Sequence, residues 1–172
     1  MFSTIYNKEI LQALLQKQKR ITAPAEDLGI TLGNPAAKHI IIKVCNPYCG
    51  PCAKAHSIID KILEENEDVK VQIIFTATND EKDIKAVPVK HLMALYEKNN
   101  PELIKQALDD WYNANTKDYD AFALKYSLNG ELKLQGEKLE LMDKWCKGTG
   151  ISVTPTMFID VTNYRKCIKL KT

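Results

Sequence analysis

The sequence contains no hydrophobic run long enough for a membrane helix, which needs roughly 18 or more apolar residues. Its first ten residues, MFSTIYNKEI, also lack the apolar centre of a secretion signal. Neither sign of charge is in excess, because 24 basic and 22 acidic side chains leave a net charge of +2. This balance argues neither for a nucleic-acid partner nor for a membrane surface, and it leaves the type of partner open. Histidine is scarce, and His39 and His91 have no companion at metal-ligand spacing.

The composition is that of an ordinary globular protein. A chain of 172 residues, of which 45% are hydrophobic, can bury one core and carry a sizeable insertion. We predict an α/β domain over residues 30–172, with a helical insertion at about 80–148. Residues 1–29 precede it as an amphipathic helix at 5–20 and the start of a connector, ITAPAEDLGITLGNPAAK, that is rich in turn formers.

The domain begins with a strand, a helix and a second strand. The run HIIIKVC at 39–45 is typical of a buried strand, and apolar residues at helical spacing follow it from about 50 to 66. A second strand lies within residues 66–78. The strand, helix, strand order predicts that the two strands pair in parallel through a crossover.

After the second strand, the spacing of apolar residues becomes that of helices. Residues 100–102, Asn-Pro-Glu, are a strong helix start signal. The chain closes with TPTMFID and YRKCIKL, which predict a β-hairpin. The apolar stripes that predict the helices of the insertion are Val89, Leu92, Met93 and Tyr96; Ile104, Ala107, Leu108 and Trp111; Tyr119, Phe122, Ala123 and Tyr126; and Leu139, Met142 and Cys146.

The segment CNPYCGPCAKAH, residues 45–56, lies between the first strand and the first helix and concentrates the reactive side chains. Its second cysteine, Cys49, stands at the helix start, where unpaired backbone N–H groups and the helix dipole stabilise negative charge. The position favours a thiolate, and Cys52 follows one turn later. We therefore expect Cys49, and not Cys52, to react rapidly with alkylating reagents.

Three interpretations of this cluster are open. In the first, the CGPC segment at 49–52 is a dithiol that closes a small disulfide ring, and it needs no cofactor. In the second, Cys45, Cys49 and Cys52 bind the iron–sulfur cluster of a radical enzyme, although such enzymes usually need a much longer barrel. In the third, His56 completes a four-ligand zinc set, although the continuous strand and helix leave little freedom to wrap a metal. The dithiol interpretation fits best.

The pentapeptide YCGPC at 48–52 resembles the WCGPC-type motif of thioredoxin. Thr154-Pro155, followed by an apolar strand, is similar to the Thr-Pro that carries a cis-proline beside the dithiol in that superfamily. The separation of Cys52 from Pro155 is too long for thioredoxin itself and matches members with a helical insertion, such as the DsbA-like oxidoreductases. The leader LGNPAAKHIIIKV also resembles thioredoxin-like domains fused to vitamin K epoxide reductase homologues. The resemblance covers about residues 30–160.

This resemblance implies a thioredoxin-like α/β fold, with the helical insertion between the second strand and the cis-proline strand. It implies a thiol–disulfide oxidoreductase in which Cys49 attacks a protein disulfide and Cys52 resolves the mixed disulfide. A non-catalytic binding module that uses the Pro155 groove is the alternative. The residues expected against the substrate are Gly50, Pro51, Thr154 and Pro155.

The implied partners are protein disulfides or dithiols and a redox recycling partner, for which a membrane quinone-linked oxidoreductase is the candidate. The implied location is extracytoplasmic, facing the periplasm, either alone or as the soluble domain of a membrane protein, with the cytoplasm as the alternative. The chain ends soon after its last strand, so we expect a partner or a further part of a larger protein to cover that face of the sheet.

The pair between the cysteines predicts the direction of electron flow. Gly50 adds no side chain, and Pro51 removes an N–H group that would stabilise the Cys49 thiolate. A less stabilised thiolate gives a more reducing couple, so we predict a reductase with a potential below about −200 mV. A cation at Lys43 would act in the opposite direction.

Lys43 departs from the thioredoxin pattern, because relatives often bury a carboxylate there to carry the proton of the second cysteine. We expect its amine to extend to solvent past the strand end. His56 is expected on the helix surface, although it would tune the dithiol if it lay beside it. Among the other cysteines, we expect Cys45 to be a buried spectator, with a third redox-linked thiol as the alternative. The remaining expectations are a buried Cys146, a solvent-facing Cys167, and a core position for Trp111, Tyr119 and Tyr126.

Overall fold

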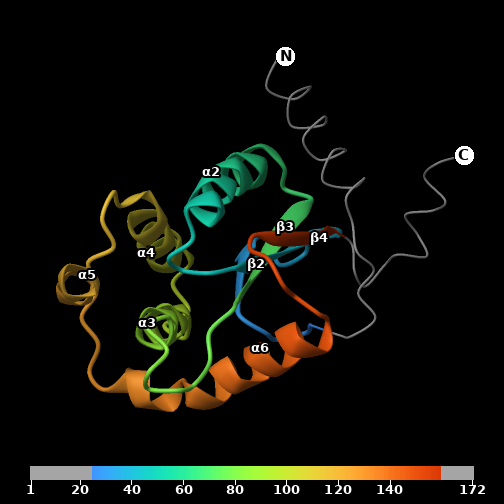
Figure 1. Cartoon of the computed structure of the whole chain (residues 1–172). Helices are drawn as coiled ribbons and strands as arrows, with labels where there is room; N and C mark the ends of the chain where they lie inside the picture. Colours follow the sequence, from blue (N-terminus) through green and yellow to red (C-terminus); the bar gives the residue numbers. More distant parts are fainter. Residues whose placement is uncertain (1–24, 160–172) are drawn as a thin grey trace, which may run out of the picture.

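A sheet of four strands forms the centre of the computed structural model, which describes residues 25–159 (Figure 1). The strands are β1 (Ile30–Gly33), β2 (His39–Cys45), β3 (Val69–Phe75) and β4 (Thr156–Ile159), and α2 (Gly50–Glu65) joins β2 to β3. The segments between β3 and β4 are α3 (Ala86–Tyr96), α4 (Pro101–Asn113), α5 (Tyr119–Lys125), the 3-10 helix η1 (Glu131–Leu134) and α6 (Gly136–Gly148). The expected helix at 5–20, the second run of the terminal hairpin and Cys167 lie outside the described residues.

The strand order is β1-β3-β2-β4. The parallel pairing of β2 with β3 is confirmed, with His39 opposite Val69 and Cys45 opposite Phe75. Strands β1 and β4 flank this pair and run antiparallel to their neighbours. The predicted thioredoxin-like α/β fold, with its helical insertion between β3 and β4, is therefore confirmed.

The interpretation of residues 21–38 as a connector was wrong in one part, because β1 lies within it. The strand is only four residues long and is bounded by Gly29 and Gly33, which both have positive φ angles of 67° and 99°. A Cβ atom at Gly29 would come within 1.9 Å of the Ile73 carbonyl oxygen, so only glycine fits against β3 there. The two glycines, which look like turn formers in the sequence, allow this short strand to pair closely.

Two helices of the insertion, α4 and α5, begin at a polar side-chain cap. The Asn100 side chain accepts a hydrogen bond from the Leu103 N–H at 3.1 Å, and Pro101 occupies the first turn of α4. Asp118 caps α5 in the same way through the Ala121 N–H, also at 3.1 Å. The apolar stripes of α3, α4 and α6 are buried, which confirms the helical reading of this part of the chain.

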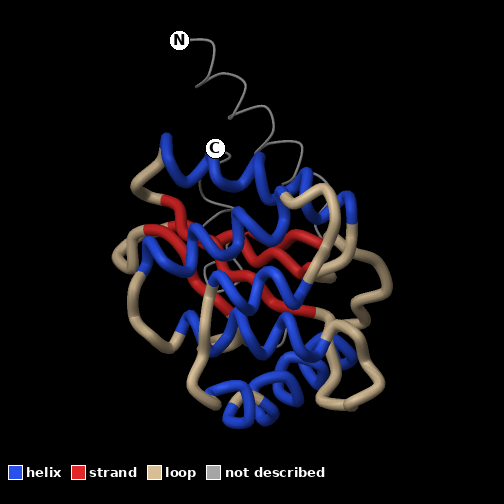
Figure 2. Tube along the Cα trace, turned by 90° about the vertical axis from the view of Figure 1, so that its left-hand side faces the viewer, coloured by secondary structure: helices blue, strands red, loops and turns tan. Residues whose placement is uncertain are grey.

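Helices cover both faces of the sheet (Figure 2), and α2 and α6 lie on opposite sides of it (Figure 1). Helix α4 packs against α2, on the side where Lys43 of β2 meets Tyr112. On the other side, Trp145 of α6 packs edge-on against Phe158 of β4, with ring centres 6.3 Å apart. Strand β2 is therefore buried on both faces, and its alternate residues face different helices. In residues 25–159, no helix is both long and apolar enough to cross a bilayer.

Candidate active site

Cys49 is the N-cap residue of α2. Its sulfur accepts a hydrogen bond from the Cys52 N–H at 3.4 Å, and its S–H group donates to the Thr154 carbonyl oxygen at 3.5 Å. The side chain of Cys49 is half-buried, whereas that of Cys52 is 0% exposed. A reagent or substrate that approaches from solvent therefore reaches Cys49 first.

Cys52 is held in a neutral, buried state. A hydrogen bond with the Cys45 thiol and burial both raise the pKa of Cys52 far above its ordinary value. The interaction with the Cys49 side chain acts in the opposite direction but is weaker. Cys52 therefore needs a group that accepts its proton before it can attack a disulfide.

The loop before β4 lies beside Cys49, 105 residues away in the sequence. The peptide bond between Thr154 and Pro155 is cis, and both residues are half-buried. Val153, just before them, exposes 68% of its surface. On the helix side, Gly50 and Pro51 are exposed, and no atom lies within 4 Å of where a Gly50 side chain would start. The half-exposed Cys49 thus has the open backbone of Gly50 and Pro51 on the helix side. On the other side lies the Thr154 loop, which carries the exposed side chain of Val153.

The expectation that Lys43 reaches solvent was wrong. Its side chain is 0% exposed, and its ammonium nitrogen lies 5.0 Å from the ring centre of Tyr112, which comes from α4. That nitrogen makes no hydrogen bond within residues 25–159. Lys43 lies in a central strand, opposite Ile73 of β3 and Met157 of β4, so it has no free edge along which to extend.

Cys45 lies two residues after Lys43 and on the same face of β2. It is 0% exposed, as expected. Burial raises the pKa of the Cys45 thiol, but the hydrogen bond with Cys52 and the charge of Lys43 outweigh burial and leave that pKa below its ordinary value. The buried side of the dithiol therefore holds a third thiol and a cation.

The expectation that His56 lies on the helix surface was also wrong. The side chain is 1% exposed because α4 covers this face of α2. Its Nε2 atom lies 2.7 Å from Asp109 Oδ1, and its ring stacks on Tyr112 with centres 5.1 Å apart. Burial lowers the pKa of His56, and Asp109 offsets this only in part. The ring is therefore neutral near pH 7.

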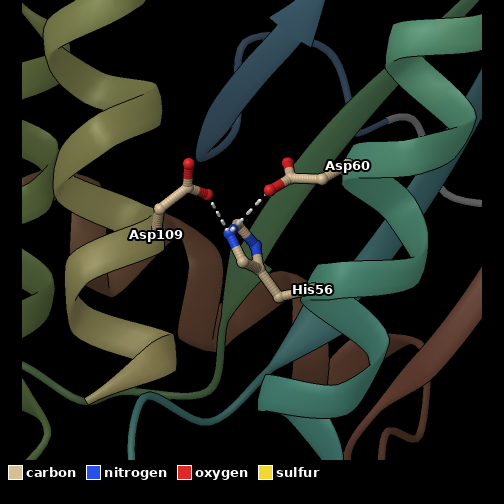
Figure 3. Close-up of side chains that lie close together, drawn as sticks. All are labelled: His56, Asp60 and Asp109. Atoms are coloured by element: carbon tan, nitrogen blue, oxygen red, sulfur yellow. Dashed lines mark hydrogen bonds and ion pairs between the residues drawn. The ribbon is translucent and has the colours of Figure 1, made fainter.

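Figure 3 shows His56 pointing toward two carboxylates, Asp60 of α2 and Asp109 of α4. Ligand-type atoms of these residues lie within 4.8 Å of one another, and the group does not include the cysteines. A cation is already present, because Lys105 Nζ lies 3.0 Å from Asp109 and 3.6 Å from Asp60. The cluster is thus an ion-pair network, and the proposed zinc set with His56 does not gather in the described residues.

The iron–sulfur interpretation also conflicts with the geometry. Cys45 and Cys52 are both 0% exposed and packed in the hydrophobic core. Two of the three proposed ligands therefore lie in a close-packed interior, which has no space for a cluster. The arrangement suits exchange between sulfur atoms instead.

The Asp60 carboxyl gives the protein a pH-dependent stability. Burial, followed by the contact with Asp109, raises the pKa of Asp60 from 3.8 to about 7. Between these values the folded protein keeps a proton that the unfolded chain has lost, so the free energy of unfolding falls as pH rises. The free energy of unfolding of Asp60→Asn, minus that of the wild type, should therefore rise by more than about 1 kcal/mol between about pH 5 and pH 8. Urea unfolding at several pH values checks this, and parallel curves for the two proteins would contradict it.

Trp111 of α4 connects the insertion to the loop before Cys49. Its indole N–H donates to the Pro47 carbonyl oxygen at 2.8 Å, and Tyr48 packs edge-on against its ring, with centres 5.6 Å apart. Trp111 and Tyr126 are buried as predicted, and Tyr119 is half-buried against the core. Sequence patterns placed Trp111 in the core but gave no sign of its contact with the active-site loop.

We predict that Trp111→Phe destabilises the fold by about 1–3 kcal/mol, because the buried Pro47 carbonyl loses its donor while the aromatic packing stays. The disulfide-exchange rate of Cys49 should fall as well, since the loop that holds Cys49 loosens. Unfolding and alkylation rates measure the two effects. Leu124→Ala on exposed α5 is the matched control, and a similar loss there would refute the role of Trp111.

Two cysteines one turn apart at a helix start, beside a Thr-Pro loop on a mixed sheet, define the thioredoxin class of fold. The family model described as Thioredoxin matches residues 26–172, and the chain belongs to this family. No curated protein matches the sequence.

Solved structures support the same fold. The catalytic domain of Proteus mirabilis ScsC is 19% identical, with a TM-score of 0.64 over 88% of this chain and 86% of that one. A periplasmic thioredoxin-like protein from Salmonella enterica serovar Typhimurium is 13% identical, with a TM-score of 0.62 over 94% and 93%. Oxidised BdbD from Bacillus subtilis is 14% identical, with a TM-score of 0.59 over 83% and 90%.

Proposed function

We propose that the protein is a thiol–disulfide oxidoreductase that exchanges disulfides with protein substrates through Cys49 and Cys52. The observation that carries the proposal is the difference between the two thiols. Cys49 is half-exposed at a helix start, and Cys52 is fully buried one turn behind it with its N–H bonded to the Cys49 sulfur. One thiol is placed to attack and the other to resolve.

The reaction has two exchange steps in the reductive direction. The Cys49 thiolate attacks one sulfur of a substrate disulfide, a mixed disulfide forms, and the other substrate sulfur leaves as a thiolate. Cys52 then loses its proton and attacks Cys49, which closes the Cys49–Cys52 disulfide and releases the second substrate thiol. The substrate gains two electrons and two protons, and the enzyme loses them.

The surface around Cys49 fits an extended peptide rather than a small molecule. Gly50 and Pro51 leave the helix side open, and Thr154 and Pro155 line the other side. Proline at 155 has no N–H, and a substrate strand can pair with the backbone beside it. Exposed Val153 offers an apolar contact at the edge of this surface.

We infer the reductive direction from Gly50 and Pro51, which add no charged or polar side chain beside Cys49, and of which Pro51 also lacks an N–H. The buried Lys43 acts in the opposite direction. In the reductive direction, a redox partner must return electrons to the dithiol. In the oxidative direction, a partner must instead remove electrons from it, and our candidate for that partner is a membrane quinone-linked oxidoreductase. An extracytoplasmic location is supported by the periplasmic Salmonella protein with the same fold.

Reduction of insulin disulfides by dithiothreitol tests the proposal. We expect the protein to accelerate insulin precipitation well above the rate with dithiothreitol alone. The control variant Cys146→Ser, which removes a buried thiol on α6, should precipitate insulin at the wild-type rate. A wild-type rate equal to that of the blank would refute the proposal. Peptide binding without turnover would instead favour a non-catalytic binding module.

A further inference from the structure

The buried side of the dithiol holds an arrangement that the two-cysteine reaction does not use. Cys49, Cys52 and Cys45 follow one another from the surface into the core, and the last two are 0% exposed. Cys52 lies one turn before His56 on α2, and the His56 ring stacks on Tyr112. Tyr112 also faces Lys43, which shares a face of β2 with Cys45. The buried thiols Cys52 and Cys45 therefore lie on the surfaces of α2 and β2 that meet at the Tyr112 ring, and the interaction with Cys45 raises the pKa of Cys52.

A second, independent observation marks Cys45 as more than a buried spectator. Lys43 lies on the same face of β2, is 0% exposed, and has an ammonium nitrogen without a hydrogen bond to any residue in 25–159. An unpaired ammonium in a protein core is costly. Its charge acts on the Cys45 thiol, and a Cys45 thiolate would be the anion that compensates it.

Other polar groups around Lys43 do not supply that anion. Tyr112 presents its ring to the ammonium at 5.0 Å, and burial raises the pKa of its hydroxyl well above the usual value. The His56 ring is neutral near pH 7, because burial lowers its pKa. Asp109 and Asp60 already have a cation beside them, because Lys105 Nζ lies 3.0 Å from Asp109 and 3.6 Å from Asp60. Cys45 is thus the group near Lys43 that gains most from its charge.

We propose that Cys45 is a third redox-active thiol, which exchanges with the Cys49–Cys52 disulfide to give a buried Cys45–Cys52 disulfide and a free Cys49. The inference rests on the proposed function, because it starts from the oxidised dithiol. It adds a second oxidised form of the same protein, in which the oxidising equivalent is held away from solvent.

The exchange is balanced within the chain. The Cys45 thiolate attacks the Cys52 sulfur, a Cys45–Cys52 bond forms, and the Cys52–Cys49 bond breaks. The electron pair of the broken bond leaves on Cys49, whose thiolate is stabilised at the start of α2. Cys45 has given up one proton, and Cys49 takes one from solvent when it is protonated. No external oxidant or reductant takes part.

The exchange has a consequence that a two-cysteine site lacks. An oxidised protein molecule regains a nucleophile at its surface, so Cys49 can attack a substrate disulfide before the protein has been reduced. Such a molecule can rearrange disulfides in a substrate without a net transfer of electrons. The substrate class stays the same, protein disulfides, but the reaction includes isomerisation.

Trapping of Cys49 in the oxidised full-length chain tests the inference. The wild type is oxidised to the Cys49–Cys52 disulfide, freed of oxidant, and incubated with excess iodoacetamide, and its disulfides are mapped by peptide mass. We expect Cys49 to become labelled while a Cys45–Cys52 disulfide appears to the same extent. In Cys45→Ser the labelling should be at least about ten-fold slower, and in Cys146→Ser it should equal the wild type. Equal labelling in wild type and Cys45→Ser, or none in either, would overturn the inference.

A second arm uses Cys49→Ser, which changes only a half-exposed residue and does not depend on the starting disulfide. Oxidation of this variant with diamide should give an intramolecular Cys45–Cys52 disulfide, which the double variant Cys45→Ser/Cys49→Ser cannot form. Free thiols or adducts on Cys52 alone would overturn the inference. Failure of the wild type to form Cys49–Cys52 would instead refute the proposed function, so the two failures are distinguishable.

Discussion

Replacing Cys49 with serine is expected to lower the turnover of protein disulfides by roughly a thousand-fold or more, because it removes the thiolate that we propose attacks the substrate. Replacing Cys52 with serine should stop turnover at a different step. The attack by Cys49 remains, but the mixed disulfide with the substrate cannot be resolved and should accumulate. Rapid alkylation within residues 49–52, read by peptide mass, should persist in Cys52→Ser and disappear in Cys49→Ser, since Cys52 is 0% exposed.

Mass spectrometry of the trapped species distinguishes these outcomes. In Cys52→Ser the substrate peptide should be linked to Cys49, and reduction should release it. Cys146→Ser is the matched control, because it removes a buried thiol far along the chain from the site, on α6. Rapid alkylation that survives in Cys49→Ser and is lost in Cys52→Ser would reverse the assigned roles.

Replacing Lys43 with methionine is expected to stabilise the folded protein by about 1–4 kcal/mol. Methionine keeps most of the volume and removes an ammonium group that has no hydrogen bond in the described part of the chain. The same change should slow the resolution of mixed disulfides, because the cation that favours a thiolate on the buried side of Cys52 is lost. Stability and activity should therefore move in opposite directions.

Urea unfolding of the reduced protein measures the first effect and single-turnover resolution measures the second. Lys61→Met, at an exposed position on α2, is the matched control and should change the free energy of unfolding by less than about 0.5 kcal/mol. A Lys43→Met variant that is less stable than the wild type would show that the ammonium has a favourable partner in the core.

The central part of the fold could be predicted because its signals are local. The β-branched run at 39–45 is long enough to identify a buried strand, and β2 has those bounds. Helix α4 begins at Pro101 because Asn100 caps it, which is a property of adjacent residues. The dithiol was also visible, since a cysteine at a helix start depends on the order of elements and not on distant contacts.

The errors share a physical cause, which is burial by distant segments. Lys43 and His56 have polar side chains that a sequence pattern places at the surface, but β4 and α4 cover them. Strand β1 was missed because two glycines that look like turn formers in fact permit close pairing with β3. None of these contacts is encoded within ten residues of the side chain concerned.

The helical insertion contacts the candidate active site directly. Helix α4 supplies Trp111 to the loop before Cys49, Tyr112 to Lys43, and Asp109 to His56. Thioredoxin-like proteins without such an insertion would have to support these positions in another way. This explains how a lysine can be accommodated under the dithiol, because an aromatic ring and a stacked histidine surround it.

The reduction potential of the Cys49–Cys52 couple tests the central claim most directly. The protein is equilibrated in glutathione buffers of graded potential, and the fraction of each thiol is read by alkylation and mass. We predict a two-electron transition below about −200 mV, on the reducing side of protein disulfide isomerase at about −180 mV, that Cys49→Ser lacks. A potential near the value of about −120 mV typical of DsbA would contradict the reductive direction. A transition that persists without Cys49, or no transition at all, would contradict the dithiol mechanism itself.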